Sequence, residues 1–375
     1  MFLVVFAITY IMWGMTYTMN DISYWSMLPS LTVNPKEREK VSSLARIGAN
    51  IGLFVVTAVV PIVSQMGRMV GTYRFIAIAV ALLFIACQVL VVVGVQEKKN
   101  VITSAQSHTT LLGMVKIIAK NDQLLAIIIC MLLFNIGYFT TTSFGLQFFY
   151  FDYGVYGGSE YTIFAITIGV AQIVTLSFYP QFSKHFNRRQ LFGLAIGLVV
   201  LGYLGFMTVG YLLPMNMIML CIIGLVLFSG QAIIQLLNLV LLADTIEYGQ
   251  WKLGTRNESI IFSLNPFITK LASAIQAGIW TYTLARSGLN SYSNQISALE
   301  KNAALTKDQI KAQANTLITQ IPASATLQMR ISMIALPLLL ILASYFVYRR
   351  FYKIDDKMYH HIIEDLEARA LTKEE

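Results

Sequence analysis

Long apolar stretches recur along this chain of 375 residues and constrain its fold more than any other feature. A helix needs about 20 apolar residues to cross a bilayer. The stretches are continuous and lack the alternating pattern of a membrane β-barrel. The sequence therefore predicts an all-α membrane protein with nine transmembrane helices, at residues 1–28, 43–65, 74–95, 123–150, 160–182, 191–213, 216–242, 258–285 and 330–352.

Composition supports a membrane location. Only 12% of the residues are charged, whereas a soluble domain has about 25%, and the mean hydropathy is +0.64. The net charge of +8 is typical of cytoplasmic loops in such a protein, so we expect the lipid bilayer and not nucleic acid as its partner. The three cysteines are isolated in apolar segments and indicate neither disulfides nor a metal site.

Lysine and arginine in the predicted loops set the orientation. One set of loops and the C-terminal tail carry 19 of these residues, and the other set carries 7. Since cytoplasmic loops are the basic ones, the first set is cytoplasmic. With nine crossings, we expect a multi-pass protein of the plasma membrane, with the N-terminus outside and the C-terminus in the cytoplasm.

The predicted spans fall into two groups. Residues 1–95 contain three spans, and residues 123–352 contain six. The cytoplasmic connection 96–122 includes a segment suited to an amphipathic interfacial helix. The outer loop 286–329 is charged and alanine-rich, with expected helical content, and the tail 353–375 is short and charged, without a regulatory domain.

The stretch from Tyr10 to Ser30 carries a carboxylate, Asp21, inside membrane-grade sequence. A charge at the bilayer centre costs at least about 2.5–3.5 kcal/mol, so it normally faces a protein interior or a wet cavity. Either Asp21 accepts sugar hydroxyls while aromatic rings stack on the sugar, or it pairs with a basic side chain among rings that only pack. The helical repeat puts it on one face with Tyr10, Trp13, Tyr17 and Trp25, one turn after Thr18.

The next polar segment, from Asn34 to Gly52, supplies Arg46. Residues 36–40 are interpreted as a cytoplasmic loop whose positive charge orients the helices. Arg46 lies within the start of the following helix and suits either a pair with Asp21 or a substrate hydroxyl. Both alternatives put Arg46 near the cavity.

A second polar constellation runs from Ala243 to Lys270. Its charges form either a salt-bridge latch at a cytoplasmic helix–loop–helix or an ordinary solvated turn. Lys270 lies about three turns into a span and needs an acidic partner or a water-filled cavity. Amides on the same helices line this interior or only cross-link helices. The latch residues are Arg38, Asp244, Glu247, Lys252, Arg256 and Glu258, and the amides are Gln231, Gln235, Asn238 and Asn265.

Motifs for hydrolysis or nucleotide binding are absent. The sequence has no GxxxxGK[ST] loop, no HExxH and no Ser/His arrangement at membrane depth. We therefore expect neither an ATP-driven pump nor an enzyme, and no cofactor beyond a coupling ion.

Three blocks carry a family resemblance: YIMWGMTYTMNDISYWSMLPSLT, then KEREK with Arg46, then ADTIEYGQWKLGTRNES. In this order they resemble the signatures of the glycoside–pentoside–hexuronide:cation symporters, a group of the major facilitator superfamily. The resemblance implies symport of a sugar with Na⁺ or H⁺ by alternating access, at a site between two six-helix bundles.

The resemblance also implies roles for particular residues. Sugar binding falls to Asp21, Tyr17, Trp25 and Arg46, and Gln235 occupies a position where a tryptophan is expected. Thr18, Lys270 and Asn265 belong to the cation-coupling region, and Arg256 to the cytoplasmic gate. Ser23 replaces a proline of the family pattern.

Family members have twelve helices, and the resemblance starts at the fourth. We therefore expect a chain that lacks three helices and the acidic residues of the cation site, with the N-terminal segment as a possible partner. The alternative function is a truncated, non-transporting membrane protein.

Overall fold

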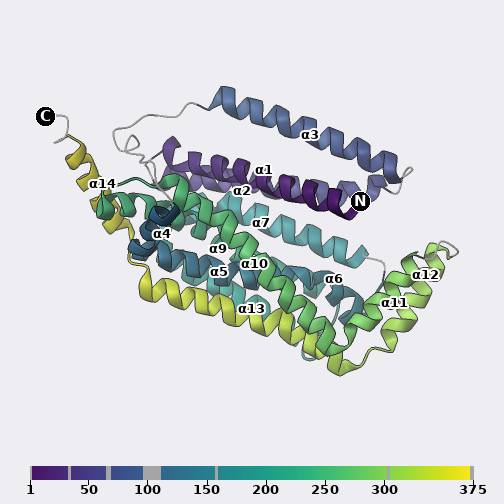
Figure 1. Cartoon of the computed structure of the whole chain (residues 1–375). Coiled ribbons are helices and arrows are strands. Elements are labelled where there is room, and N and C mark those ends of the chain that lie inside the picture. Colours follow the sequence, from purple (N-terminus) through teal and green to yellow (C-terminus); the bar gives the residue numbers. More distant parts are fainter. Residues whose placement is uncertain are drawn as a thin grey trace.

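The computed structural model describes residues 2–32, 35–64, 69–95, 111–156, 159–301 and 305–371, and these are helical almost throughout (Figure 1). The first part contains α1 (Phe2–Leu31), α2 (Pro35–Ser64), α3 (Met69–Gly94) and α4 (Leu111–Lys120). The bundle that follows contains α5 (Asp122–Ser143), α6 (Gly145–Gln147), the π-helix η2 (Phe148–Asp152), α7 (Ser159–His185), α8 (Arg188–Thr208), α9 (Met217–Leu253), α10 (Glu258–Ser287) and α13 (Ala323–Phe351). Between α10 and α13 stand α11 (Leu289–Lys301) and α12 (Lys307–Thr319), and α14 (Asp356–Leu371) follows the bundle.

Seven helical segments in these ranges are long and apolar enough to cross a membrane. The fold is thus that of an all-α membrane protein, but the count of nine spans is not confirmed. The other two predicted spans are occupied by α1 and α2, each a helix of 30 residues. The seven are Arg74–Gly94, Asp122–Asp152, Glu160–His185, Arg188–Thr208, Met217–Leu253, Ile260–Ser287 and Ala323–Phe351.

The helix ends carry local signals that the sequence encodes. Asn121 and Asn187 cap α5 and α8, and each side chain accepts a hydrogen bond from a backbone N–H of the first turn. Gly254 ends α9 in the left-handed conformation, with φ of 74°. This stop ends α9 and leads into the short connection to α10.

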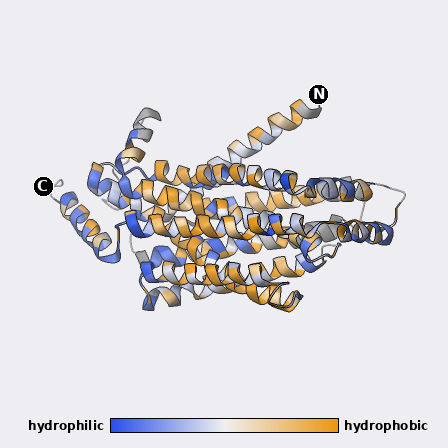
Figure 2. Ribbon diagram, turned by 90° about the horizontal axis from the view of Figure 1, so that it is seen from below, coloured by the Kyte–Doolittle hydropathy of each residue, from blue (hydrophilic) through white to orange (hydrophobic). Residues whose placement is uncertain are grey.

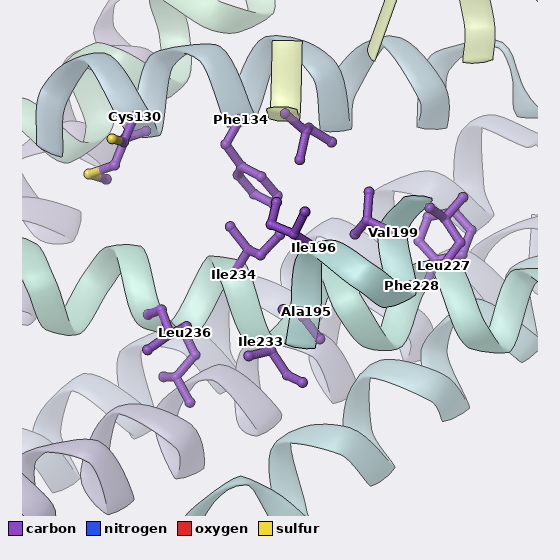
Figure 3. Close-up of a cluster of buried hydrophobic side chains, with 14 of the residues drawn as sticks. Cys130, Phe134, Ala195, Ile196, Val199, Leu227, Phe228, Ile233, Ile234 and Leu236 are labelled. Carbon is purple, nitrogen blue, oxygen red and sulfur yellow. The ribbon is translucent and has the colours of Figure 1, made fainter. Parts of the chain in front are cut away.

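The core lies where α5, α8, α9 and α13 pack together. Figure 3 shows Phe134 pointing from α5 toward Ile234 and Ile196, and all three side chains are buried. Two glycines let α8 and α9 approach closely. A Cβ on Gly202 would lie 2.7 Å from the Cα of Leu227, and one on Gly230 would lie 2.6 Å from the carbonyl oxygen of Ala195.

Apolar side chains also cover the outside of the helices. In α3 the most apolar window has no buried residue, and this helix lies along the outer edge of the molecule beside α1 and α2 (Figure 1). Hydrophilic residues gather at the two ends of the bundle, with hydrophobic residues along its length (Figure 2). This is the pattern expected of helices that face lipid.

Three segments predicted as loops or tail contain helices, and only one of the three was expected to do so. Residues 36–40 belong to the first turns of α2, so their interpretation as a loop was wrong: proline at the first helical position and Glu37 in the first turn both favour a helix start here. Residues 286–329 hold α11 and α12, which confirms the helical content expected there, and the tail 353–375 holds α14, which was not predicted. The amphipathic helix predicted within 96–122 is α4, whereas residues 96–110 lie outside the described ranges. The division into two bundles stays a prediction.

Replacing Gly202 with alanine tests the close packing of α8 on α9. The added methyl group clashes with the Leu227 backbone, and such overpacking lowers the free energy of unfolding by about 1–3 kcal/mol. The matched control is Gly197→Ala on the same helix, where a Cβ meets no atom within 4 Å. Denaturant unfolding of both variants in detergent measures the difference in their free energies of unfolding. Equal stability of the two would refute the packing argument.

Candidate functional site

A cavity of about 410 Å³ opens between α1, α2, α5, α9 and α10. Its volume is in the range of about 300–1,000 Å³ that is usual for small-molecule sites. From α1 and α2 the lining residues are Tyr17, Asp21, Trp25, Arg46 and Asn50. The cavity thus gathers the residues that the sequence predicted for sugar binding, together with Gln235 of α9 and Asn265 of α10.

Asp21 is the carboxylate of this cavity. Its Oδ1 accepts a hydrogen bond of 3.0 Å from the indole N–H of Trp25, one helical turn later. The ring of Tyr17 stacks on that of Trp13, with centroids 5.8 Å apart. Tyr10 and Trp13 are more than 60% exposed, so only the half of the predicted aromatic face nearest Asp21 lines the cavity.

Several polar atoms at the cavity have no hydrogen-bond partner in the described part of the chain. These are Nε of Arg46, Nδ2 of Asn50 and Oδ1 of Asn238. No ion pair joins Arg46 to Asp21 among the described residues, but both side chains line this cavity, so the two alternatives for Arg46 stay predictions. Since a buried polar atom without a partner is costly, such atoms at a cavity suit a hydroxyl-rich ligand.

The α5 residues of the cavity were not foreseen from the sequence. Asn135, Tyr138 and Phe139 line its wall, and the ring of Tyr138 stacks on Phe134 with centroids 6.0 Å apart. An asparagine within an apolar span was the available signal. The aromatic residues of α5 gave no sequence signal for a cavity, because aromatic rings also fill the interfaces between packed helices.

The predicted cation-coupling residues lie at the junction of α1 and α10. The Lys270 ammonium donates to the hydroxyl of Thr18 and to the Gly14 carbonyl oxygen, the latter over 3.4 Å. Lys270 is exposed rather than buried in the interior. Within the described ranges no carboxylate reaches it. Two other residues of α10 line the cavity: Thr269, which directly precedes Lys270, and Asn265, five residues before it.

A cluster of buried ion pairs lies at the end of the bundle where α2, α8 and α10 begin and α9 ends. Arg38 of α2 reaches Glu247 over 2.9 Å and Asp244 over 3.4 Å, both on α9. Arg188 of α8 contacts Asp244 as well as Glu39, the latter over 3.1 Å. We call Arg38, Glu39, Arg188, Asp244, Glu247, Arg256 and Glu258 the ion cluster; each of these side chains is at most 8% exposed.

The last two members complete the ion cluster at the α9–α10 turn. Arg256 lies 3.6 Å from Glu247 and 3.0 Å from Glu258. Every predicted latch residue except Lys252 therefore belongs to the cluster. Lys252 pairs with Asp122 of α5 at the surface instead, because it lies on another face of α9.

Glu39 and Arg188 are the members that the sequence analysis missed. Arg188 was counted among the basic residues that orient the helices, and Glu39 was interpreted as part of the charged loop 36–40. Burial of Glu39 follows from the helical start of α2, which puts residues 38 and 39 on its inner side. A basic pair, Arg188 and Arg189, gave no signal for which of the two points inward.

Helix α14 covers the ion cluster. Tyr359 is 1% exposed, and burial, together with the nearby Glu247 carboxylate, raises the pKa of its hydroxyl. The Trp251 indole donates to Asp365 over 2.6 Å, which lowers the pKa of that carboxyl. Arg369 donates to the Trp251 carbonyl oxygen over 3.1 Å. These contacts tie the C-terminal helix to the end of α9.

Comparison with known proteins gives a consistent picture. A family model described as MFS/sugar transport protein matches residues 1–356. The lactose permease of Lactobacillus delbrueckii subsp. bulgaricus is 27% identical over 98% of this chain and 55% of its own length. The raffinose carrier protein of Pediococcus pentosaceus is 28% identical over 99% of this chain and 55% of its own length. A protein of Bacillus subtilis named as an uncharacterized symporter is 25% identical over 96% of this chain and 72% of its own length.

The chain thus spans about half the length of the first two relatives. The family match extends over nearly the whole chain and gives no support to the expectation of three missing helices or of an N-terminal partner segment.

Replacing Arg38 with methionine tests the ion cluster. The change leaves Glu247 and Asp244 without their α2 partner at a buried site, which lowers the free energy of unfolding by about 3–5 kcal/mol. Lys252→Met is the matched control, because the Lys252 and Asp122 side chains are 39% and 48% exposed, and it costs at most about 1 kcal/mol. Denaturant titration in detergent measures both; similar losses in the two variants would argue against a cluster that holds α2 on α9.

Proposed function

The chain belongs to the MFS/sugar transport protein family, and we propose that it carries a glycoside or related sugar across the plasma membrane by alternating access, coupled to Na⁺ or H⁺. The observation that carries this proposal is the composition of the 410 Å³ cavity. It combines one carboxylate, one guanidinium and several amides with aromatic rings. Sugars need both kinds of group, hydrogen-bonding partners for the hydroxyls and an apolar surface for the ring faces.

Each cavity residue has a role that follows from its chemistry. Asp21 accepts sugar hydroxyls, while Trp25 and Tyr17 offer their rings to the sugar. Arg46 and Gln235 donate to sugar oxygens from the opposite helices, since the Nε of Arg46 has no other partner among the described residues. No step of this binding requires bond making or breaking, as expected of a carrier.

Cation coupling is assigned to Thr18, Lys270 and Asn265. The Lys270 ammonium already binds oxygen atoms of α1, at Thr18 and Gly14. A coupling cation that takes these oxygens displaces the ammonium and shifts α1 against α10. Because Asp21 is on α1, such a shift changes the sugar site.

The ion cluster is proposed as the cytoplasmic gate. It joins α2 to α8 and α9 directly, and to Glu258 of α10 through Glu247 and Arg256. These pairs must break when the bundle opens at this end. The surplus of basic residues on this side supports a cytoplasmic location for the gate and for the C-terminus. Two relatives are named lactose permease and raffinose carrier protein, which supports a sugar as substrate. Another relative is named a symporter, which supports ion coupling.

Uptake of radiolabelled glycosides by transport-deficient cells tests the sugar site. We expect Asp21→Asn to lower uptake at least about tenfold, because each charge-assisted hydrogen bond to a sugar hydroxyl contributes about 1.5–3 kcal/mol. The control is Asp308→Asn, the same chemical change at an exposed position of α12. Equal uptake by the two variants would exclude Asp21 from binding. No uptake by the unaltered protein, despite membrane insertion, would support the non-transporting alternative.

A second experiment tests the coupling role of Lys270. In proteoliposomes we expect Lys270→Gln to keep sugar transport down the concentration gradient of the sugar. We expect the variant to lose the stimulation of transport by Na⁺ or by an inward proton gradient. Lys311→Gln, an exposed lysine of α12, serves as the control. Unchanged ion stimulation in Lys270→Gln would remove this residue from coupling.

A further inference from the structure

A second cavity, of about 280 Å³, lies beside the first. The two share Tyr138 and Phe139 of α5 as lining residues. The second cavity continues past the end of α5 to Gly145 of α6 and reaches Phe228, almost two turns before Gln235 on α9. It therefore lies farther from the ion cluster than the first cavity does.

The walls of this second cavity are aromatic and aliphatic. Phe164 of α7 packs edge-on against Phe206 and Phe228, with centroids 5.8 Å and 6.1 Å away. The ring of Phe164 is seated against Gly224, where a Cβ would lie 2.6 Å from its Cε2. Such a fixed aromatic surface is a built feature of the bundle and not a gap left by loose packing.

Four of the five polar side chains that line the second cavity, all except Tyr161, are already bonded to the protein. The Thr141 hydroxyl lies 2.6 Å from the Tyr203 hydroxyl and 3.2 Å from the Met333 carbonyl oxygen. Gln172 donates to the Tyr138 hydroxyl over 3.2 Å, and Thr142 donates to a backbone carbonyl of its own helix. This contrasts with the first cavity, where Arg46, Asn50 and Asn238 have unsatisfied polar atoms.

The contrast decides what kind of group fits. A second sugar ring would bring several hydroxyls to a surface that offers them few free hydrogen-bond partners. Each hydroxyl that lost its water and found no partner would raise the free energy of binding. An apolar ring brings no such cost and gains by leaving water. Tyr138 connects the two environments, because its ring stacks on Phe134 in the first cavity and its hydroxyl meets Gln172 in the second.

We propose that the second cavity is an aglycone subsite, which holds the apolar and preferably aromatic aglycone of a glycoside whose sugar ring occupies the Asp21 cavity. The inference rests on the proposed function and narrows its substrate class to amphipathic glycosides. Because Tyr138 and Phe139 line both cavities, the proposal puts the glycosidic bond beside these two residues.

Calorimetric titration of the full chain in nanodiscs tests the subsite with two pairs of probes. These are the methyl and phenyl β-glycosides of glucose and of galactose, so that each pair shares one sugar and differs only in the aglycone. For the sugar that binds, we expect the phenyl glycoside to bind at least about tenfold more tightly, because a phenyl ring leaves water on binding.

Filling the second cavity separates the subsite from a general preference for apolar ligands. Ala165 lines the cavity on α7, so Ala165→Phe should lower phenyl glycoside affinity to within twofold of the methyl glycoside and leave the methyl glycoside unchanged. The matched control is Ile166→Phe, which adds a ring at the next residue, 54% exposed on the outer face. This control should keep the full phenyl preference.

The outcomes separate this inference from the function on which it rests. Equal affinities within both pairs, or a phenyl preference that survives Ala165→Phe, would overturn the aglycone subsite while leaving sugar binding intact. Binding of none of the four glycosides would overturn the proposed function and the subsite with it. Loss of methyl glycoside affinity in Ala165→Phe would place the sugar itself in the second cavity and contradict the assignment.

Discussion

Ion pairs buried away from water hold together the end of the bundle where α2, α8 and α10 begin and α9 ends. A charge in a low-dielectric interior is tolerated only with a partner, so Arg38 fixes the start of α2 against Asp244 and Glu247 of α9. Arg188 does the same for α8 through Asp244 and Glu39. The position of α2 in turn sets where Arg46, two turns farther along, meets the cavity. The geometry of the site therefore depends on pairs that lie well away from it.

Buried polar groups are paired in one part of the molecule and unpaired in another. In the ion cluster each carboxylate has an arginine, which suits a part that closes and reopens as a unit. At the Asp21 cavity, Arg46 and two amides retain unsatisfied atoms, which suits a part that receives a ligand. The neighbouring aromatic cavity has neither feature. Whether the polar groups have hydrogen-bond or ion-pair partners, more than residue type, thus distinguishes the ion cluster, the Asp21 cavity and the second cavity.

Much of this arrangement could be predicted from the sequence, and the failures have physical reasons. The spans follow from apolar length, and the face of Asp21, Tyr17 and Trp25 follows from the helical repeat. The start of α2 was missed because a run of charges suggests a loop, although proline and an early glutamate favour a helix. Long-range partners were harder. Nothing local tells that Arg188 turns inward, that Lys252 turns to Asp122, or that rings of α5 and α7 enclose a second cavity.

The central claim is that a sugar binds between Asp21, Trp25 and Arg46. A structure determined with a bound phenyl β-glycoside tests it most directly, since the position of the ligand needs no functional interpretation. The account predicts the sugar ring within hydrogen-bonding distance of Asp21 and Arg46 and against the ring of Trp25, with the phenyl ring near Phe164. A glycoside bound elsewhere, with the Asp21 cavity empty, would contradict the account.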